Sequence, residues 1–280
     1  MSLKNLLVLL DDTKANGGRL NAAIALAKAQ DAHLTGLYAI SEPDIPGFVM
    51  GQIPQDSINA RRAEAEETAK AATDAFLALA DREGVKADAR VARTLEQEVA
   101  ATVARQARYA DLAIVGQAEP EEAGPGGRNL VEKLTLSAGR PVLVIPYIGA
   151  ERPVGRVVTV AWDAGREAAR AVVDALPLLK SAEQVHLLMV NPRRGPYDHG
   201  EEPGADIALS LARHGIKIEA HTLTAPDIEE GDAILSWLSD SGSDLLVMGL
   251  YGHARLLELV VGGVSRRILE SMTVPVLMSR

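Results

Sequence analysis

Short runs of apolar residues alternate along the chain with longer stretches in which apolar residues recur at helical spacing. Residues 6–12 and 157–163 are two such runs, each ending in aspartate, and an Ala-rich stretch follows both. Within residues 165–180 the apolar positions share one helical face: Ala168, Ala171, Val172, Ala175 and Leu179. Because continuous apolar runs are typical of strands buried on both faces, the pattern predicts a mainly parallel sheet covered by helices.

The same order of elements occurs twice. Residues 111–116 correspond to residues 244–249, each an apolar run closed by glycine, and residues 141–145 correspond to residues 275–278. The repeat predicts two tandem Rossmann-like α/β domains, residues 1–149 and 150–280, each with about five mainly parallel strands and four helices. We expect the linker at residues 149–155, and we assign the extra length of the first half to a loop at residues 41–57, which is rich in proline and glycine.

Composition and charge narrow the possible functions. A length of 280 residues is typical of two domains. Aromatic residues make up 3% of the chain and the net charge is −9, which argues against stacking on bases and against neutralising nucleic-acid phosphates. Cysteine is absent, so disulfides and thiolate metal sites are excluded. Since the apolar runs are only strand-sized, we expect a cytoplasmic protein with no membrane or nucleic-acid partner.

Glycines follow the fourth apolar run of the second half. Gly249 and Gly252 come directly after it, and nine residues later Gly262 and Gly263 precede an expected helix at residues 266–272. In open parallel sheets, ligands collect at the carboxyl ends of strands, where glycine turns and helix N-termini expose N–H groups. The spacing therefore predicts an anion cradle between residues 248 and 265.

The arrangement consists of G-x-x-G, nine further residues, a glycine with a small residue and V-S, and the strand sequence T-V-P-V-L follows at residues 273–277. It resembles the ATP-binding loop of the universal stress proteins. The resemblance extends over both halves. It implies a bound ATP, with or without Mg²⁺, with Asp163 near the ribose and phosphates and Val190 offering backbone groups to adenine. It assigns the phosphates to Gly249, Gly252, Gly262, Gly263, Val264 and Ser265.

One position departs from the family pattern. The small hydroxyl residue that follows the third glycine in the family is Gly263 here, so a hydroxyl donor is missing that Ser265 could replace. His253 and Arg255 lie in the nine-residue segment, where they could add positive charge beside a phosphate. Simpler interpretations stay open: the glycines could only form turns, Asp163 could only cap a helix, and His253 could be a solvated surface residue.

The first half has lost much of this pattern. Gly116 is followed by Gln117, Ala118 and Glu119, and Arg128 and Asn129 occupy the places of the later glycines. Glutamates at positions 119, 121 and 122 would repel a phosphate. We therefore expect an empty or altered first site, with this half serving as a structural partner. In the fused pair, residues 141–146 should pair with residues 275–280 as an intramolecular pseudo-dimer, and a homodimer could form beyond it.

The known catalytic motifs of hydrolases, zinc proteases and P-loop proteins are missing, and the six histidines are scattered singly. We predict no catalytic residues and no metal site. The leading hypothesis is a nucleotide-binding regulatory module. A slow ATPase or adenylyl-transferring enzyme and an interaction protein with vestigial sites are the two alternatives.

Overall fold

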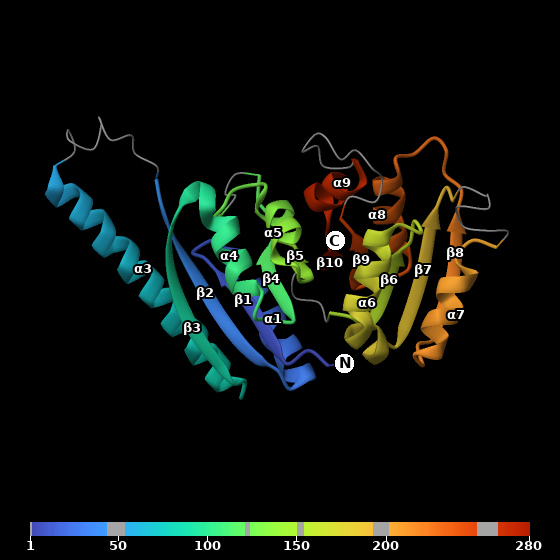
Figure 1. The fold of residues 1–280 in the computed structure, drawn as a ribbon, viewed down its shortest axis with the longest axis horizontal. Helices are drawn as coiled ribbons and strands as arrows, with labels where there is room; N and C mark the ends of the chain where they lie inside the picture. Colours follow the sequence, from blue (N-terminus) through green and yellow to red (C-terminus); the bar gives the residue numbers. More distant parts are fainter. Residues whose placement is uncertain (1, 44–53, 121–123, 150–153, 193–201, 251–262) are drawn as a thin grey trace. The chain divides into compact units, whose positions relative to one another are not determined.

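The computed structural model describes residues 2–43, 54–120, 124–149, 154–192, 202–250 and 263–280 (Figure 1). The chain divides into two compact units, residues 3–140 and residues 141–280 together with residues 1–2, and each is described by itself. The domain boundary expected at residues 149 and 150 stays a prediction.

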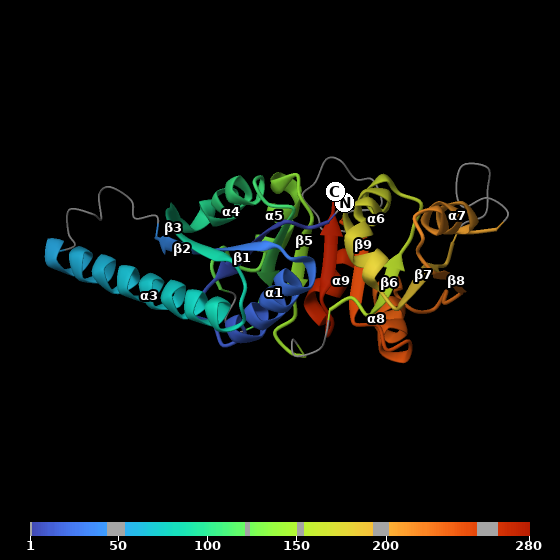
Figure 2. The same ribbon diagram turned by 90° about the horizontal axis from the view of Figure 1, so that it is seen from below.

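The first unit is a four-stranded parallel sheet with the strand order β3-β2-β1-β4. Two helices, α1 and α3, lie on one face of this sheet, and α4 and α5 lie on the other (Figure 2). Its elements are β1 (Asn5–Leu10), α1 (Asn16–Gln30), β2 (His33–Glu42), α3 (Gln55–Arg82), β3 (Ala87–Leu95), the 3-10 turn η1 (Glu96–Glu98), α4 (Val99–Ala107), β4 (Leu112–Gly116) and α5 (Leu130–Ala138).

The second unit has the strand order β5-β10-β9-β6-β7-β8, in which only β5 is antiparallel among the described strands. Helices α6 and α7 lie on one face, and α8 and α9 lie on the other (Figure 2). Its elements are β5 (Val142–Ile145), β6 (Val157–Ala161), α6 (Arg166–Ser181), β7 (Gln184–Val190), α7 (Ala205–Arg213), β8 (Ile218–Leu223), α8 (Glu230–Asp240), β9 (Leu245–Gly249), α9 (Gly263–Ser271) and β10 (Val276–Ser279).

The apolar runs form the buried strands, which confirms the fold class expected from the pattern. Strands β1, β4, β5 and β9 are buried along nearly their whole length because helices cover both faces. The expected helix at residues 165–180 is α6. The expected pairing of residues 141–146 with residues 275–280 is also present, since Val144 pairs with Val276 in an antiparallel ladder.

An aspartate before β4 and before β9 repeats the same hydrogen bonds in both units. The backbone N–H of Asp111 donates to the Asn5 carbonyl at 2.7 Å, and that of Asp244 donates to the Val157 carbonyl at 2.9 Å. Each carboxylate also accepts backbone N–H groups at the start of the neighbouring strand. These bonds align Asn5 with Val157, and the same offset of 152 residues aligns Asp11 with Asp163.

The extra length of the first half lies mainly in a helix, so the loop expected at residues 41–57 is wrong at both ends. Residues 41–42 belong to β2, and residues 55–57 begin α3. Helix α3 has 28 residues, whereas its counterpart α7 has 9. The prolines and glycines that suggested a loop lie mostly in residues 44–53, which are outside the described part of the chain.

None of the described helices combines the length and the apolar character that a helix needs to cross a membrane.

Candidate functional site

The second unit has a cavity at the carboxyl ends of β6, β7 and β9. The chain runs from β6 outward to β7 on one side, while β9 lies on the other side of β6, so the strand order reverses between β6 and β9. At such a point, the connections leave the sheet in opposite directions and a crevice opens. The cavity has a volume of about 170 Å³.

Three helices begin at this cavity. Residues from the N-terminal turns of α6, α8 and α9 line it, including Ala168, Glu230 and Val264. The first N–H groups of a helix have no partner within the helix, and the helix dipole adds partial positive charge there. Three such ends at one cavity make it suitable for an anionic group.

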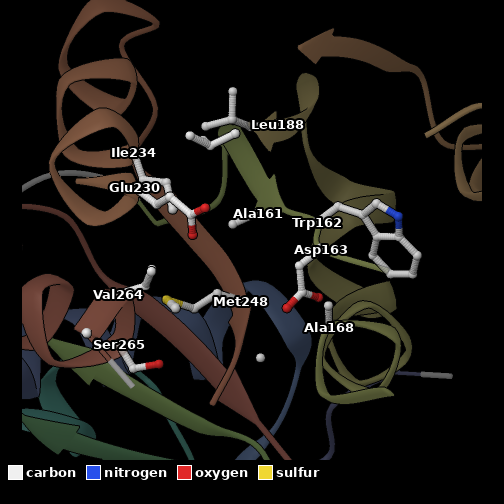
Figure 3. A pocket seen from close by; sticks show the side chains of 13 residues that line it. Ala161, Trp162, Asp163, Ala168, Leu188, Glu230, Ile234, Met248, Val264 and Ser265 are labelled. Atoms are coloured by element: carbon white, nitrogen blue, oxygen red, sulfur yellow. The ribbon is translucent and has the colours of Figure 1, made fainter. Parts of the chain in front are cut away.

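The wall of the cavity is divided by polarity. Leu188 and Ile234 form an apolar part, while the carboxylates of Asp163 and Glu230 point toward the space between them (Figure 3). The indole of Trp162 points away from Met248 (Figure 3). An apolar wall with a few convergent polar groups is the usual composition of a small-molecule site.

Asp163 occupies the turn between β6 and α6. Its Oδ1 accepts the N–H of Gly165 at 2.8 Å, which holds the carboxylate at the start of the helix. Ala164 between them has a φ of 59°, a left-handed conformation that is unusual for a residue with a side chain. The N-cap residue of α6 is Gly165, and no side chain makes a capping hydrogen bond there, so the turn holds Asp163 at the cavity without making it the cap of the helix.

Gly249, at the end of β9, is required by close packing. A Cβ atom at this position would lie 2.6 Å from the backbone N of Ala168 and from the backbone C of Glu167. Helix α6 therefore approaches β9 at a distance that only glycine permits. This packing gives Gly249 a structural role in bringing the N-terminus of α6 to the cavity.

Helix α9 begins earlier than the expected residues 266–272. It starts at Gly263, so Gly263, Val264 and Ser265 form its first turn, and all three line the cavity. A Cβ at Gly263 would have nothing within 4 Å, whereas Ser265 is only 4% exposed. The absence of a side chain at Gly263 is therefore not imposed by the described surroundings.

Comparison with known proteins places the second half in a family. The family model described as "Universal stress protein family" matches residues 155–280. Residues 155–280 are a universal stress protein domain. A universal stress protein of Synechocystis sp. is 34% identical over 70 residues, which are 25% of this chain and 23% of that protein. The aligned segment thus spans about a quarter of either chain.

The universal stress protein fold extends over both halves. The crystal structure of a universal stress protein from Archaeoglobus fulgidus DSM 4304 covers 99% of this chain and 98% of its own, with a TM-score of 0.73 and 15% identity. Another from Archaeoglobus fulgidus, in complex with dAMP, covers 51% of this chain and 98% of its own. Its TM-score of 0.36 and 13% identity are too low to bear on the ligand of this chain.

Six of the ten residues expected at the site from the universal stress protein resemblance line this cavity. They are Asp163, Val190, Gly249, Gly263, Val264 and Ser265. The other four, Gly252, His253, Arg255 and Gly262, lie outside the described residues.

Sequence reasoning missed several residues that line the cavity, among them Trp162, Leu188, Glu230 and Ile234. Glu230 lies in the first turn of α8, and Ile234 follows one turn later on the same helical face. The start of α8 after β8 was a detectable signal, because every helix that follows a parallel strand at its carboxyl end begins near the same edge of the sheet.

The corresponding place in the first unit is filled by an arginine. Arg19, on α1, forms an ion pair with Asp11 at 2.7 Å, and both side chains are almost fully buried. A Cβ at Gly116 would lie 2.3 Å from Nη1 of Arg19, so the guanidinium rests against the end of β4. The space left there is about 20 Å³.

A second cavity of about 410 Å³ lies beside this ion pair. Three carboxylates line it, those of Asp11, Asp12 and Glu64, with one arginine, Arg61. Burial and the carboxylates of Asp12 and Asp11 raise the pKa of Tyr38, which also lines it. No residue from the first turn of a described helix is among those that line it, so it lacks the backbone N–H donors that favour a polyphosphate in the second unit.

Proposed function

We propose that the second half binds an adenine nucleotide, ATP, in the cavity between β6 and β9. The observation that carries this proposal is the meeting of three helix N-termini at a strand-order reversal, with an apolar wall beside them. Helix N-termini suit phosphates because their N–H groups and dipoles face the anion. The apolar wall suits a base.

The parts of the nucleotide match different parts of the cavity. Leu188, Val190 and Ile234 would contact adenine, and the first turn of α9 would donate N–H groups to the phosphates. The carboxylates of Asp163 and Glu230 would accept hydrogen bonds from ribose hydroxyls, or Asp163 would hold Mg²⁺ bound to the phosphates.

We infer that the protein is a regulatory module of the stress response, in which the nucleotide sets conformation or partner choice. The described cavity has carboxylates and backbone donors, and no lysine or arginine side chain is among the residues that line it. The described part of this site would hold a nucleotide through backbone donors and carboxylates and not through a cationic side chain. We further propose a cytoplasmic location and assembly into a homodimer.

The test is calorimetric titration of the full chain with ATP, ADP, AMP and GTP, together with mass spectrometry of any ligand released from the purified protein. We expect adenine nucleotides to bind and GTP to bind more weakly, with negligible turnover. Saturation at 100 times the dissociation constant should stabilise the fold by about 2.7 kcal/mol.

Two outcomes would contradict the regulatory proposal in different ways. Steady release of phosphate or pyrophosphate that Asp163→Ala abolishes would show an enzyme. No thermal shift at millimolar ATP and no released ligand would show an interaction protein with a vestigial site.

A further inference from the structure

Two histidines and a glutamate meet in the second unit, apart from the residues of the nucleotide cavity. His186 Nδ1 lies 3.0 Å from His221 Nε2, and Glu219 Oε2 lies 4.0 and 3.8 Å from these two nitrogens. Their ligand atoms all lie within 4.8 Å of one another. We propose that His186, Glu219 and His221 bind a divalent transition metal ion of the zinc type.

The register of two parallel strands creates this cluster. His186 on β7 pairs with Glu219 on β8, and Leu188 pairs with His221. Because side chains alternate between the faces of a strand, Glu219 and His221 lie on the same face of β8, next to His186. The histidines are 35 residues apart in sequence, so they look isolated until the sheet forms.

The indole of Trp237, on α8, covers both imidazoles. Its ring lies edge-on to His186, with centroids 5.7 Å apart, and tilted against His221 at 4.6 Å. Its Nε1 donates to Thr159 Oγ1 at 3.1 Å, which fixes the orientation of the indole. A fixed apolar cover restricts the rotation of the imidazoles and limits the access of water, as the surroundings of metal ligands commonly do.

The distances suit a tetrahedral ion after a small adjustment. Zinc bound to two imidazole nitrogens at about 2.0–2.1 Å separates those nitrogens by roughly 3.3 Å, close to the 3.0 Å between His186 and His221. Glu219 is largely exposed and can rotate toward the ion.

The donor set points to the class of metal. Two imidazole nitrogens and one carboxylate oxygen favour zinc and its neighbours among the transition metals, whereas Mg²⁺ and Ca²⁺ prefer oxygen ligands alone. Water would complete the tetrahedral coordination.

The first unit has a cation at the matching place. Its strand register aligns Thr35 with Asp88, as His186 aligns with Glu219, and Arg90 takes the position of His221. Arg90 Nε lies 3.3 Å from Asp88 Oδ2, and Thr35 Oγ1 donates to Asp88 Oδ1 at 2.7 Å. The carboxylate of the first unit thus lies between His33, whose Nε2 is 2.7 Å from Oδ1, and the guanidinium of Arg90, and we assign the role of Arg90 in the second unit to a metal.

The first unit suggests the main variant that tests this proposal. The full chain, freed of metal by chelation, is titrated calorimetrically with Zn²⁺ alone, as wild type and as His221→Arg, which installs the residue found in the first unit. Glu219→Gln, at an exposed position, is the second variant in case His221→Arg does not fold. His214→Ala, at an exposed histidine outside the cluster, is the control.

We expect about one Zn²⁺ per chain at this site, an affinity loss of at least roughly tenfold in His221→Arg and Glu219→Gln, and no change in His214→Ala. Zn²⁺ should raise the melting temperature of the wild type more than that of the variants. Wild-type protein that does not bind Zn²⁺, or folded variants that bind it as tightly as wild type, would overturn the proposal. The nucleotide titrations are separate, so failure of either proposal leaves the other standing.

Discussion

In both halves the strand order reverses, beside β1 in the first and beside β6 in the second, and different side chains occupy the space at that reversal. In the second unit, α6 packs directly against Gly249, and a cavity of about 170 Å³ remains beside Asp163. In the first unit, the side chain of Arg19 lies between α1 and Gly116, paired with Asp11, and about 20 Å³ remains.

One aligned position accounts for much of this difference. The offset that aligns Asp11 with Asp163 also aligns Arg19 with Ala171, and both residues are buried. A buried arginine needs its carboxylate partner, so Asp11 is committed to an internal ion pair. Without that arginine, Asp163 faces the cavity. A repeated fold thus keeps its backbone frame, while one core residue decides whether the aligned aspartate is paired internally or faces a cavity with no ion pair among the described residues.

The largest effect is expected from breaking the ion pair. Arg19→Ala should lower the free energy of unfolding by about 3–5 kcal/mol, because it leaves the buried Asp11 carboxylate without its partner. Urea denaturation measures this. The double variant Arg19→Ala with Asp11→Asn should cost less than Arg19→Ala alone, since no buried charge is left unpaired. A loss below about 1 kcal/mol would mean that the pair is as weak as an exposed one.

The two aligned aspartates should respond in opposite ways. Asp163→Ala should weaken nucleotide binding by about tenfold or more, because a hydrogen bond to a charged group contributes about 1.5–3 kcal/mol. Asp11→Ala should instead lower stability and leave nucleotide affinity unchanged. Calorimetric titration and urea denaturation of both variants test this pair of expectations. Equal effects of the two variants on nucleotide affinity would show that the first unit also takes part in binding.

Gly116 and Gly249, the aligned glycines at the ends of β4 and β9, should differ in how well they tolerate a side chain. Gly249→Ala places a Cβ 2.6 Å from the backbone of α6, whereas the same change at Gly116 meets the end of the Arg19 side chain. Since backbone yields less readily than a side chain, Gly249→Ala should cost about 1–3 kcal/mol of stability, and more than Gly116→Ala. Thermal unfolding of both variants measures which substitution costs more stability. A larger loss at Gly116 would contradict the packing difference between the units.

The smallest effect is expected from restoring the hydroxyl that the family pattern has at position 263. A side chain fits there, so Gly263→Ser should strengthen nucleotide binding by the contribution of one hydrogen bond, about 0.5–1.5 kcal/mol. Gly263→Ala is the control for the change in backbone freedom. If serine and alanine give the same affinity, the hydroxyl does not reach the phosphates.

Much of the fold could be predicted from the sequence because the strands are buried on both faces. Runs such as residues 244–249 have no polar alternation, and their recurrence predicted the two α/β halves and the pairing of the last strands. The start of α3 could not be predicted in this way. Its first half, residues 55–68, has no buried position, and the buried stripe of Ala69, Thr73, Phe76 and Ala80 begins only later.

The candidate site was predicted less completely. The family motif led to Asp163 and to the first turn of α9, which both line the cavity. Glu230 carries no motif and reaches the cavity only because α8 begins at the same edge of the sheet. His186 and His221 were treated as single histidines, since neither sequence spacing nor periodicity shows which residues of two strands lie side by side.

Local patterns of apolar residues and glycine were enough to predict the duplicated α/β architecture and the glycine-rich turn after the fourth strand of the second half. The folded chain was needed to show that Arg19 pairs with Asp11 in the first unit, that three helices begin at the cavity of the second, and that two histidines and a glutamate form a cluster. The physical reason is that strand register and helix packing bring together side chains far apart in sequence, and burial then determines which charges are paired and which face a cavity.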